Sequence, residues 1–225
     1  MSPRRRGGAI PPYVKATVRW ELHALGVRLR QRVRPTRLGD GPFRLDIGAG
    51  GHGRPGWTTV DIVAPADIVT DVRWHIPLPD GSCTAIFCEH LVEHLHFRDD
   101  VPRFLAECRR LLAPGAPIRL SVPDASRYLR AYVAGQTADL GALHPEATTP
   151  MTVVNWAFHG YGHRFGWDGE TLVQALRDAG FEDVEEMEFG LSRHADLALD
   201  RPERAVESLY VEALAPSVRT FGSGR

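Results

Sequence analysis

The stretch Leu45-Asp46-Ile47-Gly48-Ala49-Gly50-Gly51-His52-Gly53, followed closely by Trp57-Thr58-Thr59-Val60-Asp61, decides the fold of this chain. It predicts a strand, a glycine turn and a second short strand that ends in a carboxylate. Glycines let the backbone approach a ligand where a Cβ would block it. Ligands of open α/β sheets bind beyond the carboxyl ends of the strands, and Asp61 can accept hydrogen bonds from two ribose hydroxyls there. The stretch therefore predicts a site for a nucleoside-like ligand.

Two cofactors compete for this glycine loop, because Gly48, Gly50 and Gly53 also match the dinucleotide pattern G-x-G-x-x-G. That pattern needs a helix at the third glycine to hold the pyrophosphate, and an acidic residue roughly 20 residues further on. Here only Arg54-Pro55-Gly56-Trp57 precedes the next strand, which is too short for an ordinary helix. S-adenosylmethionine needs no phosphate-binding helix, and Asp46 suits its ammonium group. A glycine turn without a ligand is the remaining alternative.

The chain resembles the class I S-adenosylmethionine-dependent methyltransferases over about residues 43–215. The resemblance is carried by the glycine loop, by the run P-G-W-x-x-x-D at 55–61, by Phe87-Cys88-Glu89-His90-Leu91-Val92-Glu93-His94-Leu95, and by Leu111-Leu112-Ala113-Pro114-Gly115. It implies a Rossmann-like α/β fold, with a mostly parallel seven-stranded sheet, helices on both faces and an antiparallel last strand. It also implies S-adenosyl-L-methionine as the cofactor.

The same resemblance assigns the cofactor's parts to residues of this chain. Residues at the end of the first strand would line the methionine end, the acid after the second strand would bind the ribose, and residues after the third strand would read adenine. The expected cofactor-binding residues are Asp46, Gly48, Ala49, Gly50, Asp61, Ile62, Asp71, Val72 and Glu89.

The composition sets limits on partners and compartment. A formal net charge of -1 over 225 residues gives no general attraction to nucleic acid. No apolar run approaches the roughly 18 residues of a membrane span. Cys83, Cys88 and Cys108 have neither metal-ligand nor disulfide spacing, and the pairs Glu89-His90 and Glu93-His94 lack the H-E-x-x-H order. We therefore expect a cytoplasmic protein without a metal and without a nucleic-acid partner, with a homodimer among the oligomeric states left open.

Two parts are expected in the chain. Residues 1–40 form a basic arm and helix, with disorder over 1–11 and a helix over 13–34 whose apolar positions recur at helical spacing. This helix could touch a membrane or an acidic partner, but its modest apolar face and Glu21 favour packing on the domain or over the cofactor cleft. Residues 41–225 form the cofactor-binding domain, with an irregular, substrate-covering insert at about 136–167.

Strand and helix signals alternate through the domain, which predicts a mostly parallel sheet covered by helices. Strands are expected at 44–47, 58–62, 67–70, 84–88, 118–122, 181–189 and 208–215, and helices at 101–112, 125–133 and 169–179.

The candidate catalytic residues follow the carboxyl ends of the strands. His163 and, after it, His159 lie in a segment of aromatics and glycines that could close over the cofactor, and imidazoles titrate near neutral pH. A buried loop cluster is the alternative for that segment. Asp124 borders the substrate or caps the following helix, and His90 is either a base or a brace for the helix that follows it.

The expected function is methyl transfer to an oxygen or nitrogen of a small molecule, a sugar or a secondary metabolite. This substrate class comes from the resemblance. The alternatives are a catalytically silent S-adenosylmethionine-fold binding protein, and a protein or tRNA methyltransferase.

Overall fold

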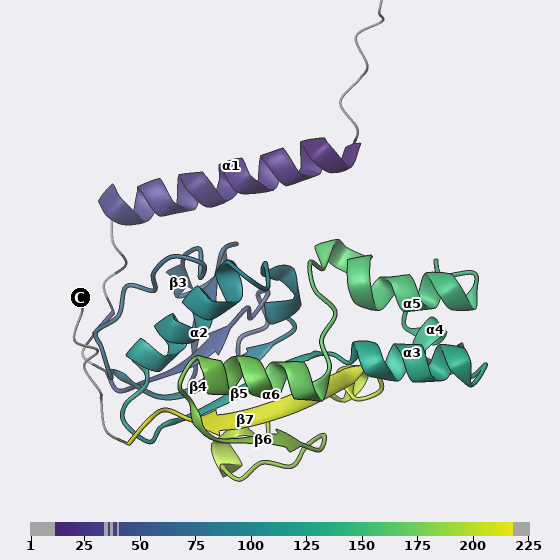
Figure 1. Ribbon diagram of the computed structural model, residues 1–225. Helices are drawn as coiled ribbons and strands as arrows, with labels where there is room; N and C mark the ends of the chain where they lie inside the picture. The colour runs from purple at the N-terminus through teal and green to yellow at the C-terminus, as the bar shows by residue number, and fades with distance from the viewer. Residues whose placement is uncertain (1–11, 34–35, 37, 40, 218–225) are drawn as a thin grey trace, which may run out of the picture.

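The computed structural model describes residues 12–33, 36, 38–39 and 41–217 (Figure 1). In these residues seven strands form one sheet in the order β3-β2-β1-β4-β5-β7-β6. The strands β1 to β5 pair in parallel, whereas β7 runs antiparallel to both β5 and β6. This confirms the predicted Rossmann-like sheet with its antiparallel last strand. The disorder predicted for residues 1–11 lies outside the described residues.

The strand bounds place the glycine loop and the acidic residues at the carboxyl edge of the parallel strands. Between β1 and β2 the described residues form turns and no helix, as the short spacing predicts. The strands are β1 (Phe43–Ile47), β2 (Thr58–Asp61), β3 (Ile68–Val69), β4 (Cys83–Glu89), β5 (Pro117–Pro123), β6 (Glu182–Met187) and β7 (Ser208–Leu214).

Helices α2 (Asp100–Leu111) and α6 (Gly169–Asp178) cover one face of the sheet (Figure 1). The buried apolar positions of α2 recur every three or four residues, so its apolar stripe faces the strands. Leu172 and Leu176 of α6 join the same core, together with the fully buried ring of Trp167. This core takes up the apolar side chains of β1, β4, β5 and β7.

The opposite face of the sheet carries buried charged side chains beside a small apolar cluster, and the segment 188–207 packs there, with the 3-10 helices η3 (Ala195–Leu197) and η4 (Pro202–Arg204). Leu197 packs there beside Phe87 of β4. The fully buried Arg119 donates from Nε to Asp200 Oδ1 at 2.8 Å and from Nη1 to Glu212 Oε1 at 2.8 Å. These ion pairs explain how charged side chains are accommodated inside this face.

The segment 136–167 contains two helices, so the expectation of an irregular insert is wrong. They are α4 (Ala138–Ala142) and α5 (Pro150–His159), and the 3-10 helix η2 (Gly160–Gly162) follows. Thr149 caps α5 in a reciprocal arrangement with Thr152, and Pro150 stands where a missing N–H costs nothing. Both helices pack with α3 (Ala125–Val133) in a small core of their own.

Helix α1 (Pro12–Val33) lies above β3 and α2 in Figure 1; its Ala24 and Val27 are buried, and polar side chains beside them bond to the domain. Arg28 bonds to Asp71, and the Gln31 amide donates to the Val69 carbonyl at 2.8 Å. The apolar positions that predict this helix lie on its other side and are exposed. They are Val18, Leu22, Leu25, Leu29 and Val33. None of the helices in the described ranges is both long and apolar enough to cross a membrane.

Candidate active site

The glycine loop after β1 has a backbone that only glycine adopts easily. Gly48 has φ 79° and Gly50 has φ 57°, both in the left-handed region. The Gly48 N–H donates to the Val60 carbonyl at 2.8 Å, which ties the loop to β2. A Cβ on Gly48 would lie 2.7 Å from Leu91 Cδ1. The loop therefore keeps its backbone bare at the carboxyl edge of the sheet.

Asp61, at the end of β2, holds this loop in place. Its Oδ2 accepts from the Gly50 N–H and its Oδ1 from the Val63 N–H, both at 2.9 Å. Its neighbour Ile62 accepts on the backbone carbonyl from His23 Nε2 of α1 at 3.1 Å. A carboxylate has about four acceptor positions, so Asp61 retains capacity for ribose hydroxyls.

The two carboxylates expected at the methionine end, Asp46 and Glu89, are buried and share Arg54. Arg54 Nη1 lies 3.0 and 2.9 Å from the two oxygens of Asp46, and its Nη2 lies 3.2 Å from Glu89 Oε2. Arg201 Nε donates to the same Glu89 oxygen. Burial raises the pKa of Asp46, and Arg54 opposes that shift. An ammonium group at Asp46 would therefore have to share the carboxylate with Arg54.

Asp71, expected to read adenine, is engaged with arginines. It is 2% exposed and accepts from Arg28 at 2.6 and 2.8 Å and from Arg73 at 2.9 to 3.3 Å. Burial alone raises its pKa, but the bonds from Arg73 and Arg28 outweigh burial and hold that pKa below its ordinary value. With α1 in this position the Asp71 carboxylate is not available to adenine, whereas Val72 beside it is buried and offers only its backbone.

A cavity of about 180 Å³ lies beside the ends of β4 and β5 and between η1 (Val92–His94), η2, η4 and helices α3 and α5. Strand β4 ends at Glu89, and the next residue, His90, lines the cavity. The cavity therefore begins at the carboxyl edge of the sheet, where the cofactor is expected. Imidazoles, carboxylates and aromatic rings make up most of its wall. They belong to His90, His94, His144, His163, Glu93, Glu207, Tyr128, Trp156 and Tyr161.

Glu93 is the most unusual side chain of this cavity. It is 1% exposed, and neither carboxylate oxygen has a hydrogen-bond partner among the described residues. His90 Nδ1 lies 3.6 Å and His94 Nε2 lies 3.9 Å from Oε1, beyond hydrogen-bond distance. Burial raises the pKa of Glu93 to about 8.

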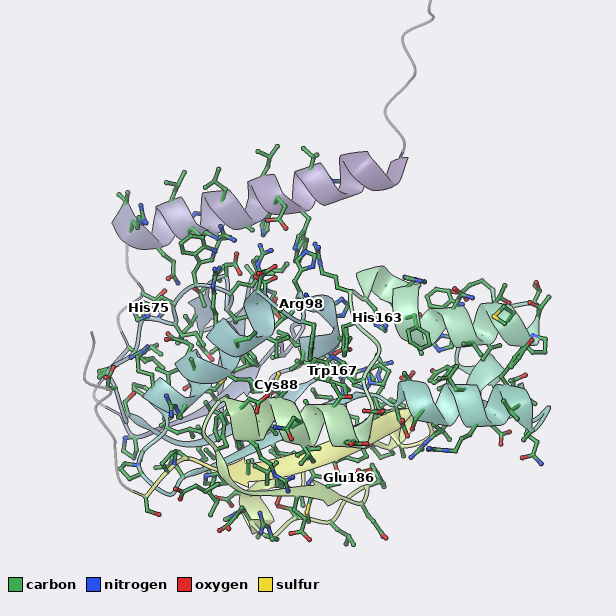
Figure 2. The ribbon with its side chains drawn as sticks, viewed as in Figure 1. His75, Cys88, Arg98, His163, Trp167 and Glu186 are labelled. Carbon is green, nitrogen blue, oxygen red and sulfur yellow. The ribbon has the colours of Figure 1, made fainter. Side chains whose placement is uncertain are left out.

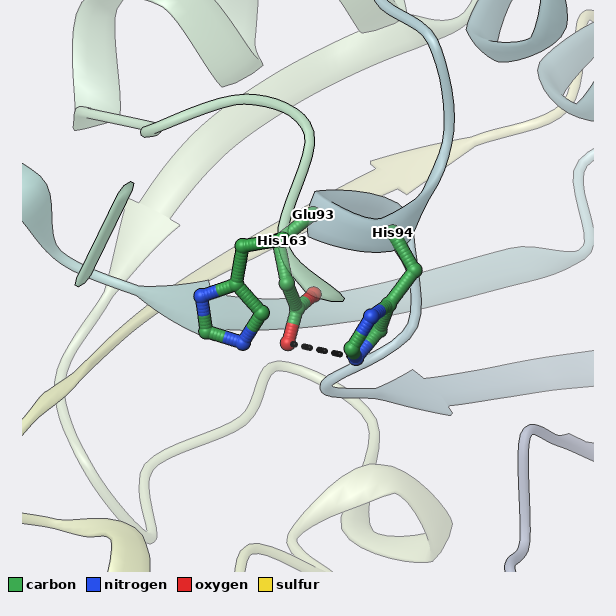
Figure 3. A group of neighbouring side chains, drawn as sticks. All are labelled: Glu93, His94 and His163. Atoms are coloured by element: carbon green, nitrogen blue, oxygen red, sulfur yellow. Dashed lines mark ion pairs between the residues drawn. The ribbon is translucent and has the colours of Figure 1, made fainter. Parts of the chain in front are cut away.

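His163 and His94 stand edge to face, with ring centroids 4.9 Å apart, beside Glu93 (Figure 3). His163 Nδ1 lies 3.0 Å from the Ala157 carbonyl, so Nδ1 carries the proton and Nε2 is the acceptor. Burial lowers the pKa of both rings, to about 4 for His94. Burial thus favours the neutral form of both imidazoles, in which one ring nitrogen keeps a free lone pair.

A hydrogen-bonded chain closes the other side of the cavity. The Tyr128 hydroxyl donates to Glu207 Oε2 at 2.9 Å and lies 3.0 Å from His144 Nε2. Arg204 Nη1 binds the second Glu207 oxygen at 2.7 Å. The sequence did not predict a role for Arg204 or Glu207, because neither belongs to a local motif. His144 could have been found from its position in the expected insert at 136–167.

Of the predicted catalytic residues, the structure brings His163 and His90 together in this cavity. His90 has φ 52°, and its Nε2 lies 2.7 Å from the Ser208 hydroxyl. Asp124 instead caps α3, accepting the Arg127 N–H at 3.1 Å, and it does not line the cavity. His159, the last residue of α5, is exposed and lies outside the lining. The predicted roles of these two residues as bases have no support in this geometry.

Residues 58–120, from β2 into β5, match the family described as a methyltransferase domain. No curated protein sequence matches the chain significantly. Among solved structures, a SAM-dependent methyltransferase from Archaeoglobus fulgidus is 17% identical, with a TM-score of 0.48 over 91% of this chain and 100% of that one.

A SAM-dependent methyltransferase from Thermotoga maritima is 19% identical, with a TM-score of 0.48 over 90% of this chain and 96% of that one. Phosphoethanolamine N-methyltransferase 2 of Haemonchus contortus, in complex with S-adenosyl-L-methionine, is 14% identical with a TM-score of 0.42 over 88% and 53%. Likenesses at this level identify no substrate. The chain therefore combines a Rossmann-like sheet with a segment that matches a methyltransferase domain, and this match supports S-adenosyl-L-methionine as its cofactor.

Proposed function

We propose that this protein transfers the methyl group of S-adenosyl-L-methionine to an oxygen or nitrogen of a small molecule of the sugar or secondary-metabolite type. One observation carries the proposal. The bare glycine loop and Asp61 lie at the carboxyl edge, and a cavity lined with imidazoles begins there, because Glu89 ends β4 and the next residue, His90, lines the cavity. The methyltransferase-domain match covers β2 to β4 and most of β5 at this edge.

The cofactor residues that fit are those with free hydrogen-bonding capacity. The backbone of Gly48, Ala49 and Gly50 would line the methionine end, and Asp61 would bind the ribose hydroxyls. Ile62 and Val72 offer main-chain groups beyond them. Asp46 and Glu89 would act through Arg54, which both carboxylates share.

The cofactor supplies an electrophilic methyl group, so the protein has to align the acceptor, exclude water and, for a hydroxyl, remove a proton. His163 is the first candidate base, because its Nε2 is the proton-accepting nitrogen and the ring lines the cavity. His90 is the second, with Nδ1 toward Glu93. The aromatic rings of Trp156 and Tyr161 would hold the acceptor at low entropic cost.

The small-molecule class is supported by the size of the cavity, about 180 Å³, which admits a compact acceptor group. The net charge of -1 offers no general attraction to a polyanionic acceptor such as tRNA. The sugar or metabolite nature of the acceptor rests on the resemblance of the motifs at 45–61 and 87–95.

Calorimetry with S-adenosylmethionine, S-adenosylhomocysteine and NAD tests the cofactor. We expect micromolar binding of the first two and none of NAD. Gly48→Val should abolish binding, because a side chain there meets Leu91. Gly190→Val is the matched control, since Gly190 also has a positive φ, 70°, but its Cβ would meet nothing within 4 Å. NAD binding without a response to S-adenosylmethionine would overturn the assignment.

Incubation with methyl-labelled cofactor and a cell extract tests the acceptor. Label recovered in the low-molecular-weight fraction supports the proposal. Label in protein or RNA would reject the small-molecule class, and cofactor binding without any transfer would identify a silent binding protein.

A further inference from the structure

We propose that Glu93, His94 and His163 bind a divalent transition-metal ion of the zinc type inside the cavity. One ligand atom from each residue lies within 4.8 Å of the other two (Figure 3). The run from Glu89 to His94 lacks the H-E-x-x-H order, so the sequence predicts no metal. The third ligand, His163, comes from a distant part of the chain. Metal binding would require only these three side chains, whatever the methyl acceptor is.

The first supporting observation is the state of Glu93. Its side chain is buried, and both oxygens lack a hydrogen-bond partner among the described residues. Leaving a polar group of this kind unpaired in the interior is unfavourable, and more so for a charged group than for a neutral one. Buried charges are paired or coordinate a metal, and a cation between the carboxylate and the two imidazoles would satisfy these oxygens.

The second observation is the orientation of His163. Its Nδ1 donates to the Ala157 carbonyl at 3.0 Å, which leaves Nε2 with the lone pair. Metal-binding histidines almost always donate their other ring nitrogen to a carbonyl, carboxylate or water, because this fixes the tautomer and ring direction.

The third observation is that the backbone holds the two contributing segments together. The Arg164 N–H donates to the Glu93 carbonyl at 2.7 Å, and the Phe165 N–H donates to the same oxygen at 3.3 Å. Glu93 and His94 are neighbours on η1, and His163 follows η2 directly. The ligand set is therefore positioned by main-chain hydrogen bonds and does not depend on a flexible loop tip.

The ligand set indicates the class of ion. Two imidazole nitrogens and one carboxylate oxygen suit zinc and related transition metals, and catalytic zinc sites use such a set with a further position open to water or substrate. Magnesium prefers oxygen ligands and keeps several waters. The open position would face the cavity, where a hydroxyl or water could bind.

The test uses the full-length protein, treated with a chelator, dialysed and titrated with Zn²⁺ in a calorimeter. Co²⁺, followed by its visible absorption, reports nitrogen and oxygen coordination in the same protein. We expect one ion per chain, and a rise in melting temperature with Zn²⁺. Removing a residue that only hydrogen-bonds to a metal ligand typically weakens metal binding by roughly 10–100-fold. Glu93→Gln and His163→Ala change the ligands themselves, so each should weaken Zn²⁺ binding by at least that factor.

His75→Ala is the matched control. Its ring is 62% exposed and contacts Glu107 at 2.9 Å, and it lies well away from His163 in Figure 2. It should bind Zn²⁺ like the wild type. Equal binding by the wild type, Glu93→Gln and His163→Ala would overturn the proposal, as would absence of binding. If Mg²⁺ competed for the site as strongly as Zn²⁺, coordination by the two imidazole nitrogens would be rejected. If Glu93→Gln does not fold, His94→Ala takes its place with the same expected loss.

Discussion

The guanidinium of Arg54 lies 2.9 and 3.0 Å from the two carboxylate oxygens of Asp46, a side chain that is itself fully buried. The same guanidinium reaches Glu89 and stands 4.0 Å from the centroid of the Phe87 ring. Arg54 follows the glycine loop, so this single side chain connects the loop to β1 and β4. The negative charge at the expected methionine end is thereby balanced from within the chain.

Removing Arg54 should be strongly destabilising. Arg54→Ala leaves Asp46 without its partner and Glu89 with Arg201 alone, and breaking a buried ion pair typically costs about 3–5 kcal/mol. Arg44→Ala is the control, because its pair with Asp196 is largely exposed and should contribute less than about 1 kcal/mol. Denaturant unfolding of both variants checks this. Equal losses for the two would contradict the role of Arg54.

Asp61→Ala should weaken S-adenosylmethionine binding by about 1.5–3 kcal/mol, the range for a hydrogen bond to a charged group. The carboxylate also accepts the Gly50 and Val63 N–H groups, so its loss loosens the loop as well. Calorimetry measures the change, with Asp196→Ala on the surface as the control. An affinity equal to that of the wild type would remove Asp61 from the cofactor site.

His163→Ala should lower turnover by roughly 10²–10⁴ if His163 is the base, with cofactor affinity nearly unchanged. His159→Ala should cost only a few-fold, because that side chain is exposed and outside the cavity. If His163→Ala lost cofactor affinity together with turnover, His163 would not be assigned as the base.

Turnover of the chelator-treated wild type separates the two roles given to His163. Full activity without metal assigns the proton transfer to the imidazole. Activity that returns only with Zn²⁺ assigns it to the metal site.

The stability of the protein should fall in acid through Asp71. Its folded pKa lies below the ordinary value of about 3.9, so its contribution is present above that value and is lost as the pH falls through the folded pKa. Asp71→Asn should cost about 1.5–3 kcal/mol at pH 6 and progressively less below pH ~4. Urea unfolding at a series of pH values checks this, and a cost independent of pH would contradict the ion pairs with Arg28 and Arg73.

Much of the fold could be predicted from the sequence because its signals are local. The glycine loop, the short gap before β2 and the three- and four-residue period of α2 each reflect neighbouring residues. Apolar residues at helical spacing also predict α1, but this spacing does not decide which side of the helix faces the domain. The partners Asp71 and Val69 decided this, since they bind Arg28 and Gln31 and leave Leu22 outside.

The candidate site is where tertiary structure was needed. The sequence by itself determined the edge of the sheet, the loop with Asp61, and the presence of His90 and His163 near that edge. Only the folded chain brought Glu93 beside His163, decided between the two predicted roles of Asp124 in favour of the helix cap, and left His159 in solvent. The physical reason is that burial and pairing of a carboxylate or imidazole depend on segments far apart in sequence, which no local pattern records.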